Sequence, residues 1–376
     1  MRRKGFLSIS FSVLMGISIK GFAQESVAII PQSEYSIESA EHFIKMTKAT
    51  QNGTMPGEKE WKELFATEGY RHFFSACRDT LFWQDNIRKA FQIVFEPAQQ
   101  TRLDSILSQP VNMDTPFENY FVINLYQTEK RIDELDKFIR HTDFQDIMRQ
   151  GHVKALCHLP PHIHQLRPTF KKFYFLSWDP ECRAWSNGIY LDINGVSING
   201  TEDMINTIGH ELHHHYMSAL LNDRYHHDTN DAAFIALCTM QQEGTADIIN
   251  KQKMPLDKMP PYGPDIVKMY NDDYFSTPEV LKQLDELTTD YLAGKISQKE
   301  YAKARNCAHF GGHTTGDYMV FLIRDQLGLQ TAIDCFADIS AFVHRYNEAA
   351  KKADTYIFSD AFVKHVDTIC WEMEQE

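Results

Sequence analysis

The strongest chemical signal in the sequence is a pair of histidines four positions apart, with a glutamate directly after the first. Residues 210–214 read His-Glu-Leu-His-His, within a stretch whose apolar spacing predicts a helix over 201–221. Residues four apart lie on one face of a helix, so the imidazoles of His210 and His214 can reach one metal ion. Glu211 projects about 100° around the helix from His210. From there it can hold a water on the open side of the metal and act as a general base.

Two further histidines flank His214 and need their own interpretation. His213 and His215 lack the four-residue relation to His210, and Glu211 fixes the register of the motif independently. We therefore interpret both as exposed or packing histidines rather than as ligands.

A catalytic zinc ion takes three protein ligands and keeps a fourth position for water. Glu243 is the candidate third ligand, because it lies in a predicted, mostly apolar helix over 230–250 where a bare carboxylate is costly. Gly244 and Ala246 are small, and we expect them to let the helix that carries the histidine pair approach closely. Asp247 lies one turn after Glu243, where it can accept a hydrogen bond from the free N–H of a ligating histidine. The expected cofactor is Zn²⁺.

The pattern H-E-x-x-H followed by E-G-x-A-D resembles the gluzincin metallopeptidases, and more closely the bacterial zinc-dependent peptidases that carry E-G-x-A-D on the third-ligand helix. The resemblance implies a metal site of His210, His214 and Glu243, with Glu211 as general base and Asp247 orienting a histidine. Two features depart from the familiar families: the gap between His214 and Glu243 is longer, and the aminopeptidase motif G-x-M-E-N is absent. The peptidase subclass is therefore left open.

Peptide hydrolysis benefits from a donor aimed at the developing oxyanion. Gluzincins supply it from a later His or Tyr, which makes His313 the first candidate and Tyr318 the second. The alternative for His313 is a structural role, in which a Gly-Gly turn precedes it and the histidine caps the next helix. The resemblance also suggests the strand over 188–193 as an edge along which a peptide could lie.

The rest of the chain supplies the elements that position these residues. Before residue 150 we predict helices over 35–49, 58–78, 83–94, 98–108, 115–126 and 129–149. Aromatic and β-branched residues predict strands over 168–178 and 188–193. Further helices are predicted over 201–221, 230–250, 277–293, 297–305, 316–327 and 329–350. The expected fold class is α+β and mostly α-helical, with a helical N-terminal region over 24–150. A zincin-like catalytic region with a small antiparallel or mixed sheet follows over 151–376.

Residues 1–23 have the pattern of a signal peptide: a basic start, an apolar stretch over 6–19, and small residues at Gly21 and Ala23. The apolar stretch is shorter than the roughly 20 residues that a membrane span needs, and the alternative is a buried N-terminal helix. Cleavage before Gln24 removes four basic and no acidic residues, which takes the formal net charge from −13 to −17. We expect an exported protein, periplasmic or secreted, with no membrane span after cleavage and no nucleic-acid partner.

These observations favour a zinc-dependent hydrolase, most simply a metallopeptidase acting on a peptide or protein. The competing interpretation is a non-catalytic exported binding protein on a zincin scaffold, against which a general base beside the ligands argues. A purely structural zinc site is disfavoured, because such sites prefer closed, cysteine-rich shells. The seven cysteines are evenly spread and contain no C-x-x-C pair.

Overall fold

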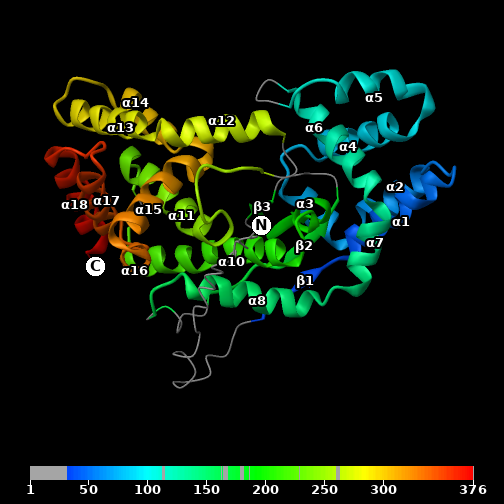
Figure 1. Ribbon diagram of the computed structural model, residues 1–376, viewed down its shortest axis with the longest axis horizontal. Coiled ribbons are helices and arrows are strands. Elements are labelled where there is room, and N and C mark those ends of the chain that lie inside the picture. The colour runs from blue at the N-terminus through cyan, green and yellow to red at the C-terminus, as the bar shows by residue number, and fades with distance from the viewer. Residues whose placement is uncertain are drawn as a thin grey trace, which may run out of the picture.

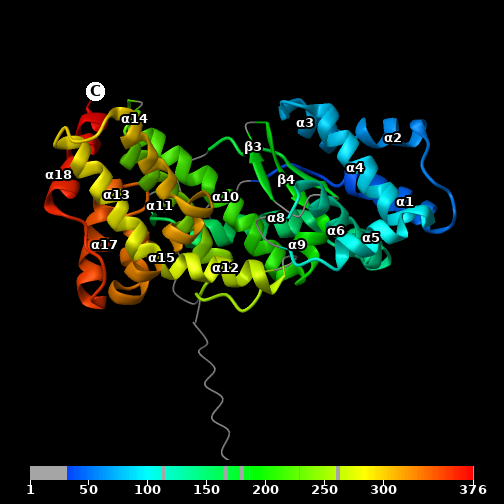
Figure 2. The ribbon, with the colours of Figure 1, turned by 90° about the horizontal axis from the view of Figure 1, so that it is seen from above.

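The computed structural model describes residues 32–111, 115–161, 163, 168–177, 182–185, 187–227, 229–259 and 263–375. It shows a mainly helical protein around one small sheet, which confirms the expected α+β, mostly α-helical class (Figure 1). The N-terminal helices lie at one end of the molecule and the C-terminal helices at the other, as both Figure 1 and Figure 2 show. The expected signal peptide, 1–23, and Trp178 at the end of the first predicted strand lie outside the described residues.

The N-terminal region is helical, as the apolar spacing predicts. Its elements are α1 (Glu38–Gln51), α2 (Glu58–Phe65), α3 (Glu68–Ala76), α4 (Thr80–Phe95), η2 (Pro97–Gln99), α5 (Gln100–Leu107), α6 (Phe117–Lys130), α7 (Ile132–His141) and α8 (Phe144–Cys157). The helix predicted over 58–78 is two helices, because Thr67 takes an extended conformation before α3. The helix predicted over 129–149 is also divided: the side chain of Asp143 accepts a hydrogen bond from the Asp146 N–H and begins α8.

Further helices follow the sheet. They are α9 (Ile193–Ser197), α10 (Thr201–Arg224), α11 (Ala232–Asn250), α12 (Pro264–Phe275), α13 (Thr277–Leu292), α14 (Gln298–Tyr301), η4 (Ala302–Cys307), η5 (His309–Gly312), α15 (His313–Leu327), α16 (Leu329–Asp334), α17 (Ile339–Ala353) and α18 (Asp360–Glu374). Helices α12 and α18 lie where the sequence pattern predicts none. Helix α15 begins at His313, three residues before its predicted start.

The sheet has the strand order β1-β2-β4-β3, from β1 (Tyr35–Ser36), β2 (Phe173–Leu176), β3 (Arg183–Trp185) and β4 (Gly188–Asp192). Strands β1, β2 and β4 run parallel, and β3 pairs antiparallel to β4. The sheet is therefore mixed. The expectation that the strand over 188–193 is an edge is wrong, because β4 pairs with β2 on one side and with β3 on the other.

The sheet separates two hydrophobic cores, because successive strand residues point to opposite faces. Phe173 and Phe175 pack into the main core with α8, α10, α11, α15 and α17. Tyr174 and Leu176 face an aromatic core formed with α1, α3, α4 and α6. Residue 150, where the sequence suggests a boundary, lies inside α8. Helix α8 contributes Ile147, Met148 and Ala155 to the main core.

Glycines set the distances between the helices that carry the candidate site. A Cβ added to Gly151 of α8 would lie 2.5 Å from Ile208 Cγ2 of α10, so the two helices are in close contact. A Cβ added to Gly244 of α11 would lie 2.3 Å from the backbone of Gly316 in α15. Gly244 therefore allows the close approach of α15. We expected it to allow the close approach of α10, which carries the histidine pair, and that expectation is wrong.

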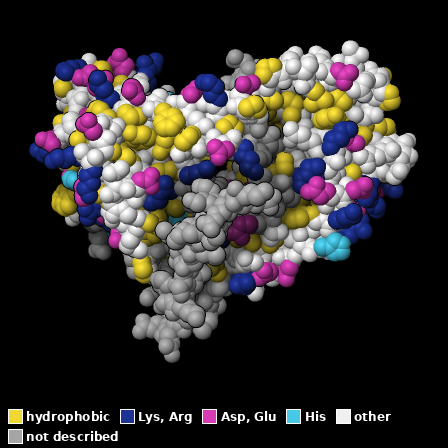
Figure 3. All heavy atoms as spheres, viewed as in Figure 1, with side chains coloured by type: hydrophobic (Ala, Val, Ile, Leu, Met, Phe, Trp, Pro, Cys, Tyr) yellow, Lys and Arg dark blue, Asp and Glu magenta, His cyan; other side chains and the backbone are white. Residues whose placement is uncertain are grey.

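Acidic and basic side chains are interspersed on the face shown in Figure 3, as expected for a solvated surface. Within the described part of the chain, no helix is both long enough and apolar enough to cross a membrane.

Candidate metal centre

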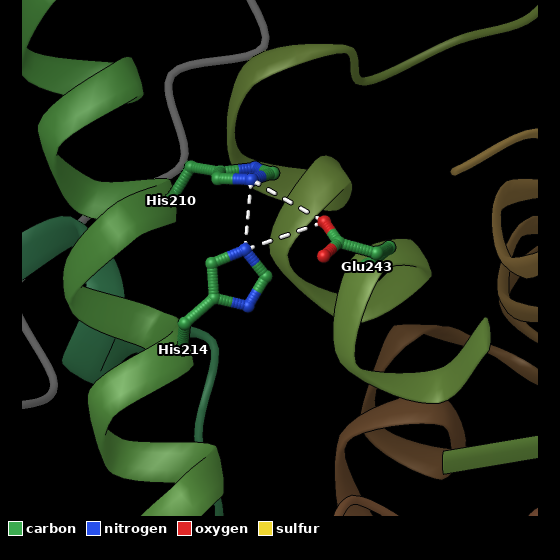
Figure 4. A group of neighbouring side chains, drawn as sticks. All are labelled: His210, His214 and Glu243. Carbon is green, nitrogen blue, oxygen red and sulfur yellow. Dashed lines mark hydrogen bonds and ion pairs between the residues drawn. The ribbon is translucent and has the colours of Figure 1, made fainter. Parts of the chain in front are cut away.

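Helices α10 and α11 bring together the three residues expected to bind metal. The Nε2 atoms of His210 and His214 lie 3.0 Å apart, because four residues separate them on one face of α10. Glu243 Oε2 reaches in from α11 and lies 3.3 Å from His214 Nε2 and 3.8 Å from His210 Nε2 (Figure 4). One donor atom from each residue falls within a group whose members are all within 4.8 Å of one another.

Asp247 lies directly behind this group and is completely buried. Its Oδ1 is 3.2 Å from His210 Nδ1, an ion-pair distance, and neither atom makes a hydrogen bond with a described residue. Its Oδ2 accepts a hydrogen bond from His313 Nδ1 at 2.7 Å and another from Lys251 Nζ. Burial alone would raise the pKa of Asp247, but the charges of Lys251 and His313 outweigh it and hold the pKa well below its usual range. One ionised carboxylate thus lies against the Nδ1 atoms of both histidines.

The carboxylates around His210 and His214 favour a positive charge between them. Burial would raise the pKa of Glu243, but the surrounding histidines, His214 first, lower it to about 2. Burial would lower the pKa of His210, but the Asp247 carboxylate, with help from Glu211 and Glu243, raises it to about 9. In the chain without metal, a proton on His210 compensates the negative charge of these carboxylates.

The residues present fit a zinc ion. His210 places Nδ1 3.2 Å from Asp247 Oδ1 and presents Nε2 toward the point that His214 Nε2 and Glu243 Oε2 also face. Two imidazole nitrogens and one carboxylate oxygen, with a carboxylate orienting one histidine from behind, form the donor set of catalytic zinc sites. His210, His214 and Glu243 are therefore the residues that would hold the ion.

Glu211 is buried beside the ligands on α10, with 7% of its surface exposed. Its carboxylate makes no hydrogen bond or ion pair with any residue that the structure describes, and its donor atoms are not part of the three-residue group. A buried carboxylate that is neither a ligand nor a partner in an ion pair is available to exchange a proton with a water or a substrate.

The two oxyanion candidates occupy different places. The ring of His313 stacks on that of His210 at 5.9 Å between centroids, and its Nε2 lies 3.4 Å from Glu243 Oε2. Tyr318, one and a half turns along α15, directs its hydroxyl to Thr355 Oγ1 at 2.9 Å. The structure brings His313 to the ligand group and brings Tyr318 to a different neighbour.

The other histidines of the motif face away from the ligand group. His213 is completely buried, and its Nε2 lies 3.3 Å from the backbone oxygen of His158. The ring of His215 packs near Phe170, with 5.9 Å between the ring centroids. Neither belongs to the group of donor atoms that could hold a metal.

Three neighbours of the site were not predicted from the sequence: Lys251, Tyr270 and Asp317. Lys251 Nζ donates to Tyr270 Oη at 2.6 Å, and the Tyr270 hydroxyl donates to Asp317 Oδ2 at 2.9 Å. Burial and the adjacent charge of Asp247 raise the pKa of Asp317 well above its usual range. Lys251 lies four residues after Asp247, and Asp317 four after His313, so helical spacing was an available signal. Tyr270 lies on α12, which the pattern does not predict.

The fold and the site together define a mainly helical protein with a His-His-Glu cluster that could hold a metal ion. The model of the family described as "Putative zinc dependent peptidase (DUF5700)" matches residues 61–355, and the chain belongs to this family. No curated protein and no solved structure matches the chain. At this general level, family and donor set agree on a zinc-dependent hydrolase of the peptidase type.

Proposed function

We propose that the protein is a zinc metallopeptidase of the gluzincin type, with His210, His214 and Glu243 as ligands and Glu211 as the general base. The observation that carries the proposal is the convergence of the three donor atoms within 4.8 Å, with Glu211 buried beside them. A scaffold that only binds a partner has no need of an unpaired buried carboxylate next to a metal centre, because such a group is costly to bury.

Zinc in this site supplies Lewis acidity, which makes a water more acidic and polarises a substrate carbonyl. Glu211 takes the proton that the water loses when its oxygen attacks the amide carbon. Glu211 then passes this proton to the leaving amine, so one carboxylate acts first as base and then as acid. Asp247 keeps the Nδ1–H of His210 directed away from the ligand group, which leaves Nε2 for the metal.

The contacts of His313 support it, rather than Tyr318, as the oxyanion donor. A carboxylate only accepts hydrogen bonds when ionised, so the 2.7 Å contact to Asp247 places a proton on His313 Nδ1. This places Nε2 on the side of the ligand group, where a substrate oxygen would approach. His313 donates from Nε2 only as the imidazolium, with a proton on each ring nitrogen. The hydroxyl of Tyr318 is instead engaged by Thr355.

The test compares the wild type with Glu211→Gln, which keeps the shape of the side chain and removes its basicity. Zinc content is measured by elemental analysis and cleavage with a peptide library on the same samples. We expect about one zinc per chain in both proteins and chelator-sensitive cleavage only in the wild type. Cleavage by the variant at the wild-type rate would rule out Glu211 as the base, and zinc binding without any cleavage would favour the binding-protein alternative.

The substrate class proposed is a peptide or protein, in an exported setting. The support for export is the signal-peptide pattern of residues 1–23. Mass spectrometry of the N-terminus after expression with an export pathway would show a chain beginning at Gln24. A chain that keeps residues 1–23 would contradict this part of the proposal.

A further inference from the structure

The turn that leads into His313 has an unusual backbone. Phe310, Gly311 and Gly312 all have positive φ, at 47°, 70° and 105°. Non-glycine residues rarely adopt this conformation, and they keep it where the surrounding structure enforces it, often at functional sites. A Cβ on Gly312 would lie 2.7 Å from the backbone oxygen of Thr239 in α11, so the turn is pressed against the helix that carries Glu243.

Asp273 of α12 holds this turn from both ends. Its Oδ1 accepts a hydrogen bond from His309 Nδ1 at 2.8 Å, just before the positive-φ residues. Its Oδ2 accepts a hydrogen bond from the hydroxyl of Thr314, just after His313. Tyr270, one turn earlier on the same face of α12, packs its ring 5.3 Å from that of Phe310. Two residues of one helix therefore fix the turn at its start, middle and end.

The position of His313 depends on this turn. The imidazole lies between two carboxylates, with Nδ1 2.7 Å from Asp247 and Nε2 3.4 Å from Glu243. Its side chain is one-third exposed, so packing alone does not hold the ring. A small change in the backbone at residues 309–312 would move Nε2 away from the ligand group.

We propose that Asp273 is a positioning residue: by clamping His309 and Thr314 it sets the strained turn that aims His313 at the reacting carbonyl. This inference rests on the proposed function, because it assumes that His313 donates to the oxyanion. Asp273 itself touches none of the three metal ligands, and no sequence motif marks it. Its effect on the reaction passes through His313 alone.

The kinetic test is a double-mutant cycle on the zinc-loaded full chain, with Asp273→Ala, His313→Ala and the double variant. Asp272→Ala is the matched control, because Asp272 directly precedes Asp273 in α12 and its side chain is 63% exposed. Loss of one oxyanion donor costs about 10²- to 10³-fold in kcat, so we expect about a 10- to 100-fold loss in Asp273→Ala, with KM and zinc content unchanged. The double variant should be no slower than His313→Ala. If the two effects multiply instead, Asp273 does not act through His313.

A second measurement does not need activity. In protein labelled with ¹⁵N-histidine, the hydrogen-bonded Nδ1–H of His313, assigned by its loss in His313→Ala, reports the contact to Asp247. We expect this signal to shift or disappear in Asp273→Ala and Asp273→Asn and to persist in Asp272→Ala. The isosteric Asn variant is included because it preserves the volume of the side chain if Ala disturbs folding. A signal unchanged in both Asp273 variants overturns the positioning role. If the wild type cleaves no peptide, the proposed function fails while this measurement still decides the role of Asp273.

Discussion

The position of Glu243 depends on the close approach of α11 to α15. The substitution Gly244→Ala perturbs this approach directly. The new Cβ would lie 2.3 Å from both the carbonyl carbon and oxygen of Gly316. Carbon atoms in contact are normally about 3.5–4.0 Å apart, so the overlap exceeds about 1 Å. Both obstructing atoms belong to the backbone, so no side-chain rotation relieves the overlap and the helices must move apart.

The expected loss of stability follows from two opposing terms. Alanine in a helix interior is about 1 kcal/mol more favourable than glycine. Overpacking of a tight contact costs about 1–3 kcal/mol and occasionally more, and a backbone contact belongs at the upper end. We expect a net loss of about 2 kcal/mol in the free energy of unfolding. For a chain of 376 residues that lowers Tm by about 2.5 °C.

The assay combines denaturant unfolding with zinc affinity and cleavage rate. A displacement of about 1 Å in a catalytic group can cost about 10²-fold in rate, so Gly244→Ala should also bind zinc more weakly and cleave more slowly. Gly263→Ala is the control, because nothing lies within 4 Å of a Cβ at that residue. Gly263 is the N-cap of α12, where alanine is less favourable than glycine, so the control should lose some stability but keep its zinc affinity and cleavage rate. A Gly244→Ala protein that is about 1 kcal/mol more stable than the wild type, with zinc affinity intact, would refute the close approach.

Two further outcomes follow from the buried polar groups. Asp247→Asn should weaken zinc binding about 10- to 100-fold, because the charged partner of His210 and His313 is lost. The affinity is measured by competition with a chelator. An unchanged affinity would mean that Asp247 does not orient a ligand. His152 is completely buried, and burial followed by the charge of His215 lowers its pKa to about 4, from 6.5 for a free histidine. The unfolded chain therefore takes up this proton at higher pH than the folded chain, so the free energy of unfolding falls as pH falls from about 6.5 to about 4, by about 3 kcal/mol at most. Urea unfolding across this range should show a smaller pH dependence in His152→Gln than in the wild type, and equal slopes would contradict the assignment.

Much of the fold was predictable because helices and buried strands leave periodic apolar patterns. Helix α10 is predicted over 201–221 and observed over Thr201–Arg224, and α11 is predicted over 230–250 and observed over Ala232–Asn250. Helix α12 was not predicted, although Pro264 is a standard first residue and Ile266, Val267 and Tyr270 have helical spacing. The inner position of β4 depends on β3, whose three residues are too few to show a period.

The candidate site also has a part that the sequence predicts and a part that it does not. His210, His214 and Asp247 have local spacings that a helix converts directly into shared faces, so sequence alone indicates where they point. The distances between α10, α11 and α15 depend on tertiary packing of glycines, which no local pattern reveals. Asp273 and Tyr270 contact the surroundings of the site from α12, and such long-range contacts are set by the whole fold.

The central claim is that His210, His214 and Glu243 bind a catalytic zinc ion. The most direct measurement is the zinc content of the purified mature chain beside Glu243→Ala, with peptide-library cleavage assayed on the same samples. We expect about one zinc per wild-type chain, strong loss of zinc in the variant, and cleavage that follows the zinc and stops with a chelator. A wild-type chain that binds no zinc after reconstitution, or a variant that keeps zinc and activity, would contradict it.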